Sequence, residues 1–152
     1  MGLTCALASA CQAPSAAQLP EALQTHLKNE RLEVVTSIRG LPLGVRDELQ
    51  TLFASQTLDI AEPGAEFQVT DEIKNPGLPI RRLVAAGCSI DHCLVHYERG
   101  GKAHTWHVAL LHWTPEATRF EWGGSAPNSL ATIDTVRTAV LSGTIKGANS
   151  GW

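Results

Sequence analysis

The stretch "HCLVHYERGGKAHTWHVALLHWTPEATRFEW", residues 92–122, accounts for most of the predicted sheet. Three runs rich in β-branched, aromatic and leucine residues are separated by "RGGK" and "TPEA", which are typical turn sequences. Strands joined by short turns pair antiparallel, so the stretch predicts a three-stranded β-meander. Further strands are expected at "LEVVTSI" (32–38) and "IRRLVAAG" (80–87).

Two segments outside this stretch have the apolar spacing of amphipathic helices, with a third, weaker pattern beginning at Pro20. The inward-facing residues are Val45, Leu49, Leu52 and Phe53 in the first segment, and Leu130, Ile133, Val136 and Val140 in the second. We therefore expect an α+β fold, in which an antiparallel meander sheet has two or three helices packed on one face.

The chain has 152 residues, which suits one domain. We expect residues 1–19 to form a leader and linker, residues 20–143 a single α+β domain, and residues 144–152 a flexible C-terminal tail. The formal net charge of −3 argues against nucleic-acid binding, which needs a basic face. No apolar run reaches the roughly 18 residues that span a bilayer, so membrane association is expected only through a lipid anchor.

The N-terminal stretch "MGLTCALASACQAPSAAQ" is small, apolar and uncharged. Its Leu3–Ala10 segment has the length of a signal-peptide apolar region, and Ala8-Ser9-Ala10 fits the small-x-small cleavage pattern. "LASAC" resembles the lipobox of bacterial lipoproteins, although Ala8 stands where a branched aliphatic residue is usual and no Lys or Arg precedes the apolar run. The resemblance implies lipidation at Cys11 and a periplasmic or outer-membrane location. The alternative is a cytoplasmic protein with an unstructured tail.

Removal of the leader would leave Cys88 and Cys93 as the remaining cysteine pair. In an oxidising compartment, two thiols this close in sequence are expected to form a disulfide. In the cytoplasm they would instead be two thiols, buried or metal-bound. The compartment therefore determines the chemistry of the pair.

Five of the six histidines lie between residues 88 and 113. Cys88, Cys93, His107 and His112 have the loose spacing of a two-Cys, two-His zinc finger, but the histidines fall on a strand, where five residues of separation point them to opposite faces. A different metal site is compatible with the strands. With a tight turn centred on Gly100-Gly101, Leu94 pairs with His107, and His92 and His96 are diagonal neighbours of His107 on the same sheet face. The candidate ligands are therefore His92, His96 and His107, which could hold zinc or copper.

This histidine site depends on the register of the hairpin, because a one-residue slip separates the three rings. The alternative is an ordinary solvated sheet face. Phosphate-binding glycine loops, G-x-S-x-G elbows and H-E-x-x-H motifs are all missing from the sequence. We therefore expect a small exported protein that acts by binding, with a protein partner such as an enzyme that it inhibits. A metal-binding protein or metal-dependent enzyme is the alternative.

Overall fold

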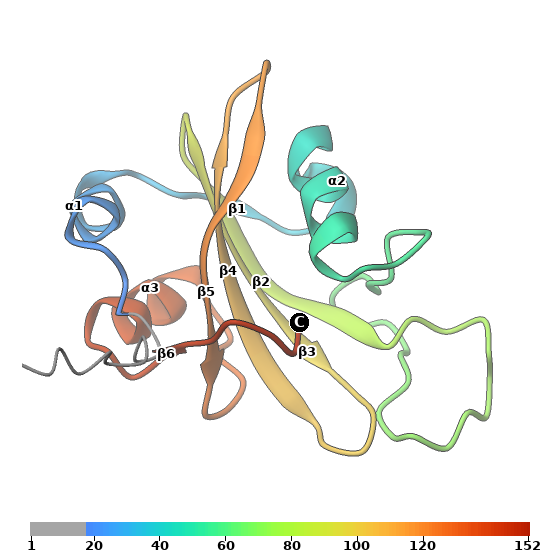
Figure 1. Cartoon of the computed structure of the whole chain (residues 1–152). Coiled ribbons are helices and arrows are strands. Elements are labelled where there is room, and N and C mark those ends of the chain that lie inside the picture. Colours follow the sequence, from blue (N-terminus) through green and yellow to red (C-terminus); the bar gives the residue numbers. More distant parts are fainter. Residues whose placement is uncertain (1–17) are drawn as a thin grey trace, which may run out of the picture.

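A computed structural model describes residues 18–152, and the candidate cleavage site and Cys11 lie outside this range. Six strands form one antiparallel sheet in the order β1-β2-β3-β4-β5-β6, so each strand is hydrogen-bonded to its neighbour in sequence (Figure 1). The strands are β1 (Glu33–Val35), β2 (Arg81–Cys88), β3 (His92–Arg99), β4 (Thr105–Trp113), β5 (Thr118–Ala126) and β6 (Lys146–Gly147). The predicted α+β fold with an antiparallel meander is confirmed.

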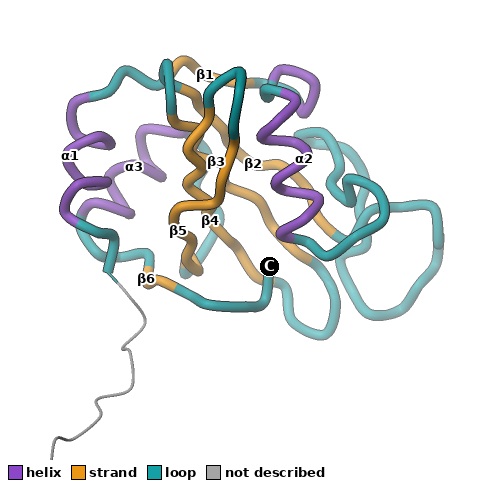
Figure 2. Tube along the Cα trace, turned by 45° about the horizontal axis from the view of Figure 1, so that its top comes forward, coloured by secondary structure: helices purple, strands orange, loops and turns teal. Residues whose placement is uncertain are grey.

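Three α-helices accompany the sheet, and they cover both of its faces (Figure 2). Helices α1 (Glu21–Asn29) and α3 (Ile133–Leu141) pack on one face, whereas α2 (Leu43–Leu52) packs on the other. A short 3₁₀ helix, η1 (Ile38–Gly40), precedes α2. The expectation that all helices share one face is therefore wrong for α2. None of the helices within residues 18–152 is long and apolar enough to cross a membrane.

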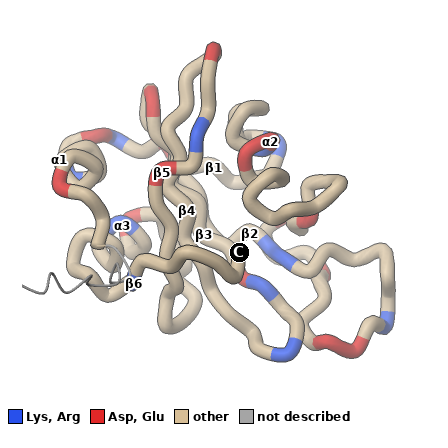
Figure 3. Tube along the Cα trace, in the orientation of Figure 1, with Lys and Arg blue, Asp and Glu red and all other residues tan. Residues whose placement is uncertain are grey.

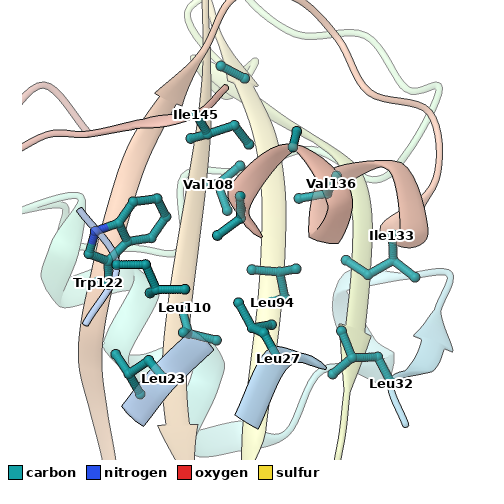
Figure 4. Close-up of a cluster of buried hydrophobic side chains, with 14 residues drawn as sticks. Leu23, Leu27, Leu32, Leu94, Val108, Leu110, Trp122, Ile133, Val136 and Ile145 are labelled. Atoms are coloured by element: carbon teal, nitrogen blue, oxygen red, sulfur yellow. The ribbon is translucent and has the colours of Figure 1, made fainter. Parts of the chain in front are cut away.

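The two-sided arrangement follows from the central strands, which are apolar on both faces. On β3, Leu94 joins the core under α1 and α3, and Cys93 and Val95 join the core under α2. Figure 4 shows the first core, in which Leu23 and Leu27 of α1 meet side chains from the sheet and from α3. A strand that is buried on both faces reads as a continuous apolar run, and this sheet therefore needs a helical layer on each side.

The β3–β4 hairpin has a wider turn than expected. Leu94 lies opposite Leu110, and His107 lies opposite Tyr97 instead of Leu94. The pairing ends at Arg99 and Thr105, so residues 100–104 form the connection, with Gly101 at a φ of +121°. The register differs from the expected one by three residues. Because that number is odd, it reverses which β4 side chains share a face with a given β3 side chain.

Residues 144–152, which were expected to form a flexible tail, pack against the sheet in the structure. Ile145 is buried in the first core, and β6 adds a short sixth strand beside β5. The Trp152 ring packs edge-on against Phe120, with 5.3 Å between ring centroids. Gly123 leaves room for it, because a Cβ at that position would lie 2.3 Å from the Trp152 ring.

Candidate metal centre

The structure does not bring His92, His96 and His107 together. His92 and His96 share the sheet face that α1 and α3 cover, but they are four residues apart on β3, which is about 13 Å along a strand. His107 stacks on Tyr97, and Tyr97 belongs to the core on the opposite face. The predicted three-histidine site is therefore wrong, and the cause is the register of the hairpin.

His96 is fully buried, and both of its ring nitrogens are hydrogen-bonded. Nδ1–H donates to the main-chain oxygen of His107 at 2.8 Å, and Nε2 accepts from the main-chain N–H of Leu130 at 3.1 Å. Burial lowers the pKa of His96, which keeps the ring neutral. With both nitrogens occupied in this way, His96 links β3, β4 and the segment before α3, and it is not available as a metal ligand.

His92 instead belongs to a cluster that sequence reasoning did not assemble. Its Nδ1 lies 2.9 Å from an oxygen of Asp91 and 3.2 Å from both carboxylate oxygens of Glu30. The Nδ1 of His26 lies 2.5 Å from Glu30 Oε1. Each of these four residues offers one nitrogen or oxygen atom as a possible ligand, and these four atoms all lie within 4.8 Å of one another. Two imidazoles and two carboxylates therefore converge on one point.

The end of α1 supplies one half of this cluster. His26 and Glu30 are four residues apart, so they lie on the same side of the helix, one turn apart. Glu30 is the residue at which α1 ends, with an extended backbone that directs the chain toward β1. Its side chain is largely buried, with 18% exposed, whereas the side chain of His26 is 48% exposed. The cluster is thus open to solvent on the His26 side.

The turn between β2 and β3 supplies the other half. Ser89 organises this turn: its main-chain N–H donates to the oxygen of His92 at 2.7 Å, and its Oγ accepts from the His92 N–H at 3.0 Å. The Ser89 hydroxyl also donates to Glu30 Oε2 at 2.5 Å. A disulfide between Cys88 and Cys93, which face each other across the two strands, closes the turn at its base. Asp91 and His92 are therefore held in place by both hydrogen bonds and a covalent link.

The spacing of the four donor atoms suits a four-coordinate metal ion. Zinc binds imidazole nitrogen and carboxylate oxygen at about 2.0–2.1 Å in a tetrahedron, which places ligand atoms about 3.4 Å from one another. The observed separations are 2.5 Å for His26–Glu30, 2.9 Å for His92–Asp91 and 3.2 Å for His92–Glu30, and no pair among the four donor atoms exceeds 4.8 Å, so the separations lie on both sides of that value.

The electrostatics of the cluster also favour a cation. Burial is the largest single influence on the pKa of Asp91 and raises it, but the hydrogen bonds and charges of His92, Glu30 and His26 together outweigh burial, so the net pKa is lowered. Asp91 is consequently a carboxylate at neutral pH. A further imidazole, that of His112 on β4, packs edge-on against His92 with 5.2 Å between ring centroids.

Sequence reasoning missed His26 and Glu30 because they precede Asp91 and His92 by some sixty residues. The local signals were a histidine and a glutamate four residues apart on a weak helix, and an Asp-His pair in a turn. Each signal is common alone, and the fold is needed to join them. A comparison of the chain with protein-family models, curated proteins and solved structures gave no match in any of the three.

Proposed function

We propose that this protein is a small exported binding protein whose ligand is a single transition-metal ion, with zinc the best fit. The observation that carries the proposal is the convergence of His26, Glu30, Asp91 and His92, whose donor atoms all lie within 4.8 Å of one another. They come from two parts of the chain that are far apart in sequence, one at the end of α1 and the other in the β2–β3 turn.

The donor types select among metals. Calcium and magnesium prefer sets made entirely of oxygen ligands, whereas two imidazoles with two carboxylates suit zinc or copper. The number of donors bears on what the metal would do. Four protein ligands complete the coordination of a tetrahedral zinc ion, whereas catalytic zinc sites keep one position for water or substrate. A complete ligand set supports holding a metal ion over catalysis.

The disulfide supports the export part of the proposal. Cys88 and Cys93 are directly opposed on β2 and β3 and are joined through their sulfur atoms. Structural disulfides persist in oxidising compartments and are rare in the bacterial cytoplasm. A periplasmic or outer-membrane location, with lipidation at Cys11 as the anchor, remains the expectation from the leader.

The experiment is a titration of the metal-free full chain with zinc and with copper by isothermal calorimetry, with metal content measured after dialysis. We expect one ion per chain. His92→Ala should weaken zinc binding by about 100-fold or more, because it removes the buried ligand. The matched control is His104→Ala, since His104 is also bonded to a glutamate, with 2.6 Å between its Nε2 and Glu98 Oε2. His104 lies in the β3–β4 connection, at the end of β3 opposite to His92.

Zinc binding that is absent, substoichiometric, or weakened equally by His92→Ala and His104→Ala would contradict the proposal. In that case the four residues are a hydrogen-bonded cluster that fastens α1 to the β2–β3 turn. Circular dichroism of both variants should show an unchanged fold, because neither side chain is part of the apolar cores.

A further inference from the structure

A second polar cluster lies on the opposite face of the sheet, at the end away from the β2–β3 turn. Arg81 on β2 and Arg99 on β3 lie directly opposite each other. Arg81 is buried and well bonded: its guanidinium donates to Asp59 at 2.8 Å and to the main-chain oxygen of Trp152 at 2.5 Å, and it covers the Phe53 ring. Figure 3 shows basic segments on β2 and on the β3–β4 hairpin, close to the C-terminal end of the chain.

Arg99 lacks the hydrogen bonds and the ion pair that Arg81 has. Within residues 18–152 it makes no ion pair and no side-chain hydrogen bond, and its Nε is buried without an acceptor. Like charges that face each other across two strands are destabilising unless an anion compensates them. Asp59 compensates Arg81, whereas Arg99 forms no ion pair with an Asp or Glu side chain in the described part of the chain.

Unsatisfied polar atoms concentrate in the same region. Seven buried side-chain nitrogen and oxygen atoms in the described part of the chain have no hydrogen-bond partner, and four of them belong to this cluster. They are Nε of Arg81, the hydroxyl of Tyr97, Nε of Arg99 and Nδ1 of His107. Each can donate a hydrogen bond. Orphaned buried donors are rare in proteins, and a group of them points to an acceptor that the chain itself does not supply.

A cavity of about 510 Å³ lies beside these groups. Its polar lining residues are Arg99, Lys102, Thr105, His107, Ser125 and Ser150. Ile80 and Ala103 add apolar surface, and neither Asp nor Glu is among the lining residues. The volume is in the range of small-molecule sites and is well above what one inorganic oxyanion fills.

We infer that this cavity binds a small organic molecule that carries a carboxylate or phosphate group. The guanidinium of Arg99 receives the oxyanion, because it offers several N–H groups in a plane and has no partner in the chain. Lys102, Thr105 and His107 surround the same space, and Ile80 and Ala103 contact the uncharged part of the ligand. The site is separate from the proposed metal centre, since it lies on the other face and at the other end of β3.

The test uses the full chain at constant ionic strength, titrated with succinate, with inorganic phosphate and with uncharged succinamide. The readout is the NMR signals of the His107 imidazole and the Arg99 side chain. We expect saturable shifts with succinate or phosphate in the millimolar range and none with succinamide. A response to succinate alone identifies carboxylate ligands, and a response to phosphate alone identifies phosphorylated ligands.

Arg99→Gln should weaken the response by about tenfold or more, because it removes the charge that receives the anion. Arg39→Gln is the matched control, since Arg39 is exposed and does not line the cavity. Lys102→Gln, in the exposed turn, offers a second variant whose fold is not at risk, and it should also weaken binding. The inference is overturned by shifts that do not saturate, by an equal response to succinamide, or by equal binding to Arg99→Gln and Arg39→Gln.

Discussion

Cys88 and Cys93 lie directly opposite each other on β2 and β3, and their disulfide closes the turn that carries Asp91 and His92. The bond restricts the two proposed ligands before any metal arrives. We predict that the double variant Cys88→Ser/Cys93→Ser loses about 2 kcal/mol of unfolding free energy, the loop-closure value for so short a loop, and also binds zinc more weakly. Urea unfolding and zinc titration measure the two effects. Reductant should reproduce the loss of stability and the weaker zinc binding in the native sequence, and it should change neither in the double variant. An unchanged zinc affinity of the double variant would show that the turn is rigid without the disulfide.

His96 provides a prediction that separates structure from metal binding. Its ring nitrogens bond the main-chain oxygen of His107, in a fully buried place, and the N–H of Leu130, in a partly buried one. We predict that His96→Leu lowers the unfolding free energy by about 2–4 kcal/mol, because it leaves two main-chain groups unsatisfied. Zinc affinity of the folded fraction should not change. A loss of zinc binding in a stably folded His96→Leu variant would return this histidine to the metal site.

The stability of the metal-free protein should fall as the pH is lowered from 7 toward 4. Burial, together with Arg99, Arg81 and His96, lowers the pKa of His107 to about 4, whereas an exposed histidine has the ordinary value of 6.5. Between these two values the unfolded chain binds a proton at this position and the folded chain does not. The free energy of unfolding therefore decreases by roughly 3 kcal/mol as the pH falls over that interval, and His107 causes no further decrease below pH 4.

Urea unfolding at a series of pH values measures this dependence, and His107→Phe serves as the comparison. The substitution keeps an aromatic ring beside Tyr97 but removes the titrating group. The native chain should lose more stability than the variant between pH 6.5 and pH 4. Parallel curves for the two proteins would mean that the pKa of His107 is the same in the folded and the unfolded chain.

Gly123 and Trp152 give a test of the C-terminal segment. A methyl group at residue 123 would collide with the Trp152 ring at 2.3 Å, so Gly123→Ala should cost about 1–3 kcal/mol through overpacking. Trp152→Ala opens the space, and the double variant should therefore be less destabilised than the sum of the two single variants. Thermal unfolding of the four proteins completes the cycle. Exact additivity would show that the Trp152 ring does not rest on the sheet in solution.

The fold was largely accessible from sequence because its signals are local. The runs around Leu94, Val108 and Phe120 alternate with turn sequences, and this pattern is enough to predict an antiparallel meander. The helical layer on the second face was missed because Cys93 and Val95 are apolar residues on the side away from Leu94, and a fully apolar run does not reveal which neighbours cover each face.

The candidate site was much less accessible, since it depends on register and on contacts between distant segments. The glycines in the turn suggested a tight connection, but the strands separate at Arg99 and Thr105, and this difference moved His107 to the other face. His92 is a candidate ligand both from the sequence and from the structure, but its neighbours in the structure are His26, Glu30 and Asp91. Its contacts with Glu30 require α1 to pack beside the β2–β3 turn, which no spacing in the sequence indicates.

The most direct test of the metal centre is zinc K-edge X-ray absorption on the zinc-loaded full chain. We predict a first shell of four nitrogen and oxygen ligands at about 2.0–2.1 Å, with the outer-shell scattering of two imidazoles and no sulfur. One of those imidazoles should disappear in His26→Ala and in His92→Ala, and neither should disappear in His104→Ala. A shell that contains sulfur, or an imidazole count that is the same in all three variants, would contradict this prediction.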